Sequence, residues 1–130
     1  MRRRRREGHD RGAAAVEMAL VLPLLIVLLF GIIDFGRIYT AQIQLSQAAR
    51  EGVRMESLGF PGDVSTRAHA AAPGLSSMTV AVTRACPAAP LPNDSAEVTV
   101  GWHPTGLILV GWIPGIDRNY PQTATMRCQG

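Results

Sequence analysis

The 130-residue sequence contains only two cysteines, and its three histidines stand apart from one another. Two cysteines are too few for a disulfide scaffold, and neither a CxxC pair nor the cysteine–histidine spacing of a zinc site occurs. The GxSxG nucleophile motif, the HExxH zinc motif and the acidic pattern of a calcium loop are absent too. The sequence therefore predicts a protein that is not an enzyme and that uses no metal ion and no cofactor.

Positive charge is scarce outside the amino terminus. The chain has 13 basic and 10 acidic residues, but six of the basic residues lie within residues 1–12. Removing that segment, with its two acidic residues, changes the formal charge from +3 to −1. The remainder carries no basic stripe and no nucleic-acid-binding motif, so we expect no nucleic-acid partner. Beside an apolar segment, the arginine run is better explained by the positive-inside rule, which predicts a cytoplasmic leader over residues 1–12.

No charge occurs between Glu17 and Asp34, where nearly every residue is aliphatic or aromatic. As a helix, residues 13–33 would span about 31 Å, enough to cross the hydrocarbon core of a bilayer. We therefore predict a transmembrane helix over residues 13–36, in the cytoplasmic (inner) membrane, with everything after it extracytoplasmic. A cleaved secretory signal is the weaker interpretation, because the run is long and no small-residue cleavage site follows it.

The helical pattern continues past the membrane. Apolar residues recur at three- and four-residue steps from Ile38 to Val53, with polar residues largely between them. We predict an amphipathic extension over residues 37–58, so that one helix runs from about residue 13 to about residue 57, preceded by a disordered leader. Asp34 and Arg37 are three residues apart and are expected to form an ion pair at the outer edge of the membrane.

Residues 59–130 are expected to form a small mixed domain, which makes the fold class α+β. Residues 63–72 suit a short helix, and alternating apolar residues predict strands near residues 78–83, 97–102 and 123–128. An apolar stretch interrupted by glycines, residues 106–115, is too short to span a membrane. We expect it to form a loop or short helix that covers the sheet.

Both cysteines fall on the predicted extracytoplasmic side, where disulfides persist. Cys86 closes the first predicted strand and Cys128 closes the third, so neighbouring strands would bring their ends together. We expect a disulfide between them. The alternative is a pair of unbonded, buried thiols that behave as small apolar side chains.

The amino-terminal motif GAAAVEM resembles the processing site of the type IV prepilin superfamily. In that superfamily a prepilin peptidase cuts after glycine, and a glutamate stands fifth in the mature chain. A cut between Gly12 and Ala13 would make Glu17 fifth. The alternative for Glu17 is a passive position at the membrane interface, near the positive end of the helix dipole.

The longer segment RGAAAVEMALVLPLLIVLLFGIIDFGRIY resembles TadE-like pseudopilins of the tight-adherence (Tad/Flp) pilus machinery. AAREGVR on the extended helix, and then VTVGW and ATMRC, are also similar to that family. The resemblance is dense over residues 11–54 and limited to short segments over residues 75–128. One departure is Met18, where Flp-type major pilins usually have tyrosine, and this difference fits a pseudopilin better than a main filament subunit.

This resemblance implies a non-enzymatic, membrane-anchored pseudopilin that acts in assembly of a Tad/Flp-type pilus or a related secretion system. It implies as partners a prepilin peptidase, other pilins or pseudopilins, and the Tad inner-membrane assembly proteins, besides the bilayer itself. Glu17 would pair with the new amine of a neighbouring subunit and set the register of assembly. The alternative function is an unprocessed single-pass envelope protein whose outer domain binds a ligand or partner. A membrane-tethered enzyme would need catalytic residues that the sequence does not offer.

Overall fold

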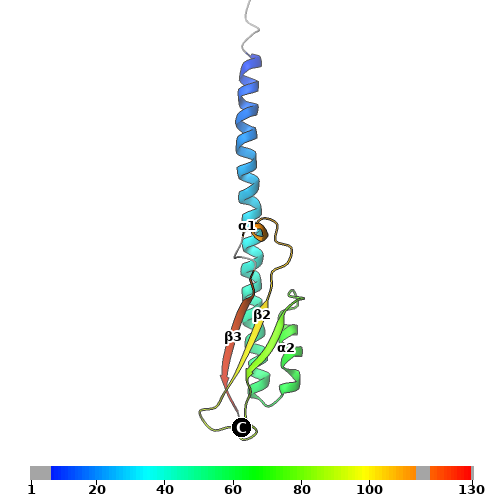
Figure 1. Ribbon diagram of the computed structural model, residues 1–130, viewed down its shortest axis with the longest axis vertical. Helices are drawn as coiled ribbons and strands as arrows, with labels where there is room; N and C mark the ends of the chain where they lie inside the picture. Colours follow the sequence, from blue (N-terminus) through cyan, green and yellow to red (C-terminus); the bar gives the residue numbers. More distant parts are fainter. Residues whose placement is uncertain (1–6, 114–117, 130) are drawn as a thin grey trace, which may run out of the picture.

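A computed structural model describes residues 7–113 and 118–129 of the chain (Figure 1). A single long helix, α1 (Glu7–Ser57), carries a small domain on its carboxyl-terminal half. That domain contains the 3₁₀ turn η1 (Pro61–Asp63), helix α2 (Val64–Ala71) and strands β1 (Thr79–Arg84), β2 (Ser95–Trp102) and β3 (Tyr120–Arg127). The predicted α+β fold, a long amino-terminal helix followed by a small antiparallel sheet, is confirmed.

Helix α1 ends where the sequence predicts and begins earlier. Its last turn is closed by Gly59, whose φ of +82° is a left-handed conformation that glycine adopts without strain. Next to it, the Phe60 N–H donates to the Met55 carbonyl over 3.0 Å. At the other end, the helix begins at Glu7, so the expectation that residues 7–11 are disordered is wrong.

The two halves of α1 have opposite surroundings. None of the side chains in its most apolar stretch is buried within the molecule. The carboxyl-terminal half buries one stripe, at the helical spacing predicted from the sequence: Ile38, Ala41, Leu45, Ala48, Ala49 and Val53. The stripe faces the sheet and α2, and the amino-terminal half extends beyond the domain, with no partner element among the described residues (Figure 1).

The three strands form one antiparallel sheet in the order β1-β2-β3. Alternate residues of the central strand point to α1, so Ala96, Val98 and Val100 are fully buried. Strand β1 is more exposed than its alternating sequence predicts: Val82 is 41% exposed although it pairs with the buried Val98, because β1 is an edge strand. All three predicted strands are present, with their ends shifted by a few residues.

Helix α2 packs on α1 beside the sheet. The approach is close at Gly52, where an added Cβ would lie 3.2 Å from Cγ1 of Val98 and 3.6 Å from Cγ1 of Val64. Val64 and Ala68 are the buried residues of α2. The single hydrogen atom of Gly52 therefore lets the sheet and α2 approach the same turn of α1.

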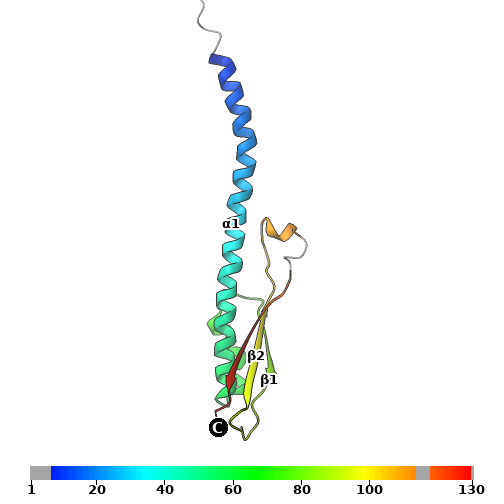
Figure 2. The same ribbon diagram turned by 90° about the vertical axis from the view of Figure 1, so that its left-hand side faces the viewer.

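The apolar stretch after β2 does not cover the sheet, which corrects the sequence-based expectation. It forms the 3₁₀ turn η2 (Val110–Trp112), which stands beyond the sheet on the side of the amino-terminal half of α1 (Figure 2). Hydrogen bonds to α1, described below, hold it there in place of packing on the strands. Residues 114 and 115 of the predicted stretch lie outside the described residues.

Candidate functional site

The predicted processing site lies on an open part of α1. Gly12, Ala13 and Glu17 are all exposed, and a Cβ built on Gly12 would meet nothing within 4 Å. Gly12 and Glu17 are five residues apart, about 7.5 Å along the helix axis. No other described part of the molecule shields this segment from a second protein. Cleavage after Gly12 and the role of Glu17 stay predictions.

The segment that follows has the length and composition of a membrane span. Over the described residues, one helix is long and apolar enough to cross a bilayer, and it begins at Gly12. Its aliphatic side chains are exposed on every side, including Leu20, Leu24 and Leu28. A helix that is apolar all round belongs in lipid or against other apolar helices.

Asp34 ends the uncharged run, and it is fully buried. Its Oδ1 accepts the Ile108 N–H over 3.1 Å, and its Oδ2 accepts the Leu109 N–H over 2.7 Å. One turn further, Nη1 of Arg37 donates to the Gly106 carbonyl over 2.9 Å. Such bonds between a charged side chain and the main chain are stronger than bonds between neutral groups. Asp34 and Arg37 thus both hold residues 106–109, and the predicted ion pair between the two side chains stays a prediction.

These contacts were missed by sequence reasoning, which placed both side chains at the membrane edge with only each other as partners. The Asp34 bonds join positions 74 and 75 residues apart in the chain. The only signal was an acidic residue immediately after an apolar run, which does not identify the N–H groups that donate to it.

Beside the hydrogen bonds that Asp34 and Arg37 form with residues 106–109, a groove of about 440 Å³ opens between α1 and the loops that follow α2 and β2. Its lining includes Arg37, Gln44, Trp102, Thr105 and Leu107. Oε1 of Gln44 is buried without a hydrogen-bond partner in the described part of the molecule. The groove can offer amide and guanidinium groups to a ligand. Across the described residues, no group of three or more His, Cys, Asp or Glu side chains is placed to hold a metal ion.

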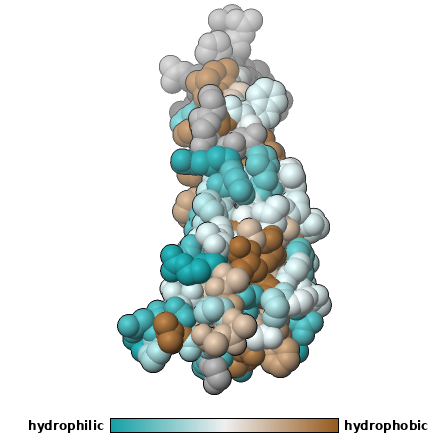
Figure 3. Space-filling view, turned by 60° about the horizontal axis from the view of Figure 1, so that its bottom comes forward, coloured by the Kyte–Doolittle hydropathy of each residue, from teal (hydrophilic) through white to brown (hydrophobic). Residues whose placement is uncertain are grey.

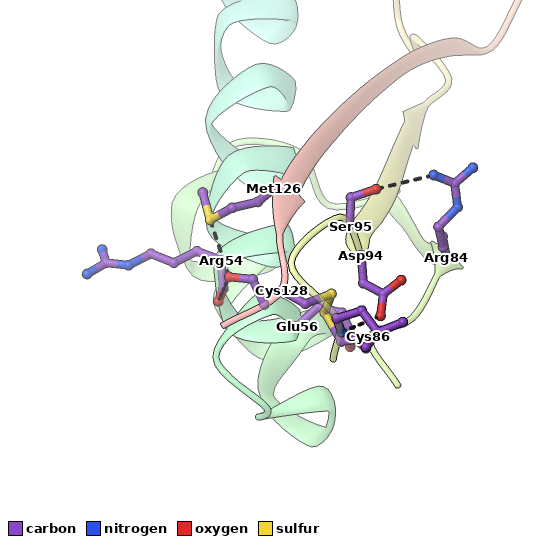
Figure 4. Close-up of a disulfide and its surroundings, with 10 residues drawn as sticks. Arg54, Glu56, Arg84, Cys86, Asp94, Ser95, Met126 and Cys128 are labelled. Carbon is purple, nitrogen blue, oxygen red and sulfur yellow. Dashed lines mark hydrogen bonds between the residues drawn. A yellow bond between two sulfur atoms is a disulfide. The ribbon is translucent and has the colours of Figure 1, made fainter. Parts of the chain in front are cut away.

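The far end of the domain is closed by a disulfide between Cys86 and Cys128, whose Cα atoms are 5.8 Å apart (Figure 4). The reasoning from neighbouring strands was wrong, because β2 lies between β1 and β3. Both outer strands run in the same direction, so their carboxyl ends reach the same edge of the sheet, about two strand spacings apart. Each cysteine lies just beyond the end of its strand, and there the two segments come close enough for the bond.

Side chains and main chain at the end of α1 anchor this disulfide (Figure 4). Oε1 of the buried Glu56 accepts the Cys86 N–H over 3.2 Å, and the Cys128 N–H donates to the Asp94 carbonyl over 3.0 Å. The Ser57 carbonyl accepts the Gln129 N–H over 3.0 Å. The carboxyl end of the chain is thereby tied both to α1 and to the loop between β1 and β2.

Comparison with known families bears on the amino-terminal part of the chain. Residues 12–54 match the family model of TadE-like protein. The matched segment begins at the predicted cleavage glycine and ends one turn before the end of α1. It confirms the resemblance to TadE-like pseudopilins and points to a protein associated with a Tad pilus.

The match covers about a third of the chain, so the sheet lies outside the TadE-like segment. No curated protein and no solved structure matches the chain. TadE-like pilus-associated proteins are generally structural rather than enzymatic. An apolar helix in the TadE-like segment is also compatible with a single-pass membrane protein.

Proposed function

We propose that this chain is a non-enzymatic TadE-like pseudopilin that acts in assembly of a Tad/Flp-type pilus or a related secretion system. The observation that carries the proposal is the TadE-like match, which starts at Gly12 on a helix whose apolar stretch is not buried by any described part of the molecule. Residues 1–12 form the cytoplasmic leader, residues 13–36 span the inner membrane, and residues 37–58 extend the helix. Residues 59–130 form the extracytoplasmic domain.

In this proposal a prepilin peptidase removes the leader between Gly12 and Ala13. Before the cut, the arginine-rich leader keeps the amino end in the cytoplasm. After it, Ala13 carries a new cationic amine four residues before Glu17. A helix that is apolar all round can leave lipid and pack against other pilin or pseudopilin helices, with the Tad inner-membrane proteins as further partners.

Glu17 sets the axial alignment of one subunit helix against its neighbour. A carboxylate within a membrane costs a few kcal/mol at the bilayer centre and less toward its edge. Two buried charges of opposite sign are tolerated mainly where they meet, so the pair between Glu17 and a neighbour's amine selects one axial offset between subunits. Its contribution to net stability is small compared with its contribution to specificity.

Sequencing the amino terminus of the membrane-purified protein tests the processing step. We expect a start at Ala13, and Gly12→Ala should leave a longer chain that keeps its leader, because the peptidase needs close access to the backbone at the cut. Since a Cβ at Gly12 meets no atom within 4 Å, the substitution leaves the fold of this chain unchanged. A variant that matures at the wild-type rate would show that the site is assigned wrongly.

Glu17→Ala tests the register role. We expect unchanged or stronger membrane retention but loss of pilus assembly, because the amine of the neighbouring subunit loses its partner. Glu51→Ala is the matched control, since it removes an exposed carboxylate from the same helix outside the apolar run. If Glu17→Ala cells assemble pili as the wild type does, Glu17 is only an interfacial residue.

A second candidate function is an unprocessed single-pass envelope protein that binds a ligand in its outer domain. The groove beside Arg37, with the unpaired Oε1 of Gln44 buried at its wall, favours this candidate. An intact leader on the purified protein would support it, and a start at Ala13 would exclude it.

A further inference from the structure

The loop after β2 carries an apolar surface that the domain leaves uncovered. Within residues 106–113, here called the apolar turn, Trp112 is 90% exposed, Ile108 is 48% exposed and Ile113 is 47% exposed. None of the eight residues is charged. The far end of the domain, by contrast, is mainly hydrophilic or neutral, with small separate apolar areas (Figure 3).

We propose that the apolar turn is a second membrane contact, which lies in the outer interfacial layer of the same bilayer that α1 spans. The inference rests on the proposed membrane-spanning role of α1. The apolar turn contacts the lipid headgroups and the upper part of the acyl chains, and Trp112 is the anchoring side chain.

The position of the apolar turn along α1 supports this assignment. Asp34 bonds the N–H groups of Ile108 and Leu109, so that part of the turn lies level with the first charged residue after the apolar run. Residues 13–33 cover a hydrocarbon core of about 30 Å, and the headgroup layer adds about 5–7 Å on each side. Asp34 and the turn it holds therefore fall in that layer, continuous with the lipid-facing surface of α1. Both ribbon views place η2 beyond the sheet toward the span (Figures 1 and 2).

The chemistry of the turn suits this depth. Main-chain N–H groups need acceptors where water is scarce, and the Asp34 carboxylate supplies acceptors to two of them. A Trp ring has an apolar body and a polar N–H, and such rings concentrate at the boundary between acyl chains and water. The isoleucines add apolar area beside it. The two contacts, span and turn, would together fix the depth and rotation of α1.

The two tryptophans of the chain allow a direct test. The full chain is reconstituted in phosphatidylcholine–phosphatidylglycerol vesicles in two versions: Trp102→Phe, which leaves Trp112, and Trp112→Phe, which leaves Trp102. Trp102 is the matched control because it is half-buried at the end of β2, where it lines the groove, and lies outside the apolar turn. Lipids brominated near the headgroup quench shallow tryptophans, and lipids brominated near the bilayer centre quench deep ones.

We expect Trp112 to emit at a shorter wavelength than a tryptophan in water and to lose most of its emission with the shallow quencher. Trp102 should keep most of its emission with the same quencher. Adding Asp34→Ala to the Trp102→Phe chain should reduce the quenching of Trp112, whereas Glu51→Ala should not. Vesicle flotation of each sample distinguishes failure of the proposed contact by the turn from failure of the proposed membrane span. A chain that stays with the vesicles but has a long-wavelength, unquenched Trp112 would overturn the inference alone and leave a protein partner for the turn. Loss of the chain from the vesicles would overturn both the inference and the proposed membrane span.

Discussion

Reduction of the disulfide between Cys86 and Cys128 should remove a large share of the stability of the outer domain. The two cysteines are 42 positions apart, and restricting a denatured loop of that length stabilises the folded state by about 4 kcal/mol. Whole domains are stable by only about 5–15 kcal/mol. The effect should be severe here, because the core is a single layer between one face of a three-stranded sheet, α1 and α2.

The assay is urea unfolding of the full chain in detergent micelles, followed by Trp102 emission in the Trp112→Phe background, with and without reductant. At a urea slope of about 2 kcal/mol/M, the midpoint should fall by about 2 M on reduction. The double variant Cys86→Ala, Cys128→Ala is the control, and it should unfold like the reduced chain in either condition. Two cysteines that react with a thiol reagent in the unreduced, denatured protein would refute the bond. A midpoint that does not move on reduction would refute the loop-entropy reasoning.

Two further predictions use the same unfolding assay. Gly52→Val should destabilise the domain by about 1–3 kcal/mol through overpacking, since a Cβ at position 52 already lies 3.2 Å from Cγ1 of Val98. Gly36→Val is the control on the same helix and should have little effect, because nothing lies within 4 Å of the added Cβ. Equal losses of stability in the two variants would contradict the packing argument. Glu56→Ala should lower the free energy of unfolding by about 1–3 kcal/mol because the Cys86 N–H loses its acceptor. Glu56→Gln retains an acceptor oxygen and should be destabilised less, so a Gln variant less stable than the Ala variant would contradict this role of Glu56.

Local periodicity in the sequence predicted much of the fold. The stripe from Ile38 to Val53 and the alternation at Val98 and Val100 state which side chains are buried, because burial on one face imposes a period of 3.6 or 2 residues. The end of the helix near residue 57 was also predicted from the local sequence. The start of α1 was placed too late because the charged residues before Gly12 were taken as a sign of disorder.

The remaining features depend on contacts between segments far apart in the chain. The order of the strands, with β2 in the centre, has no local signature, so the strands that end near Cys86 and Cys128 were taken as neighbours. The apolar turn was predicted to cover the sheet, since apolar loops are commonly buried against the core. Its actual position depends on Asp34, a bond partner 74 residues away from Ile108. The TadE-like motif around Gly12 and Glu17 could be read directly, because it is a contiguous pattern.

The continuity of α1 has a mechanical consequence. The same helix supplies the apolar span and the buried stripe of the outer domain, with no hinge segment between them. Beyond Pro23, a rotation or tilt of the outer part of the span is therefore passed directly to the sheet. Inserting one residue near position 40 would turn the outer domain by about 100° relative to the span and shift it by about 1.5 Å. Asp34 would then point away from residues 108 and 109, so the orientation of the domain above the membrane is set by the number of residues in one helix.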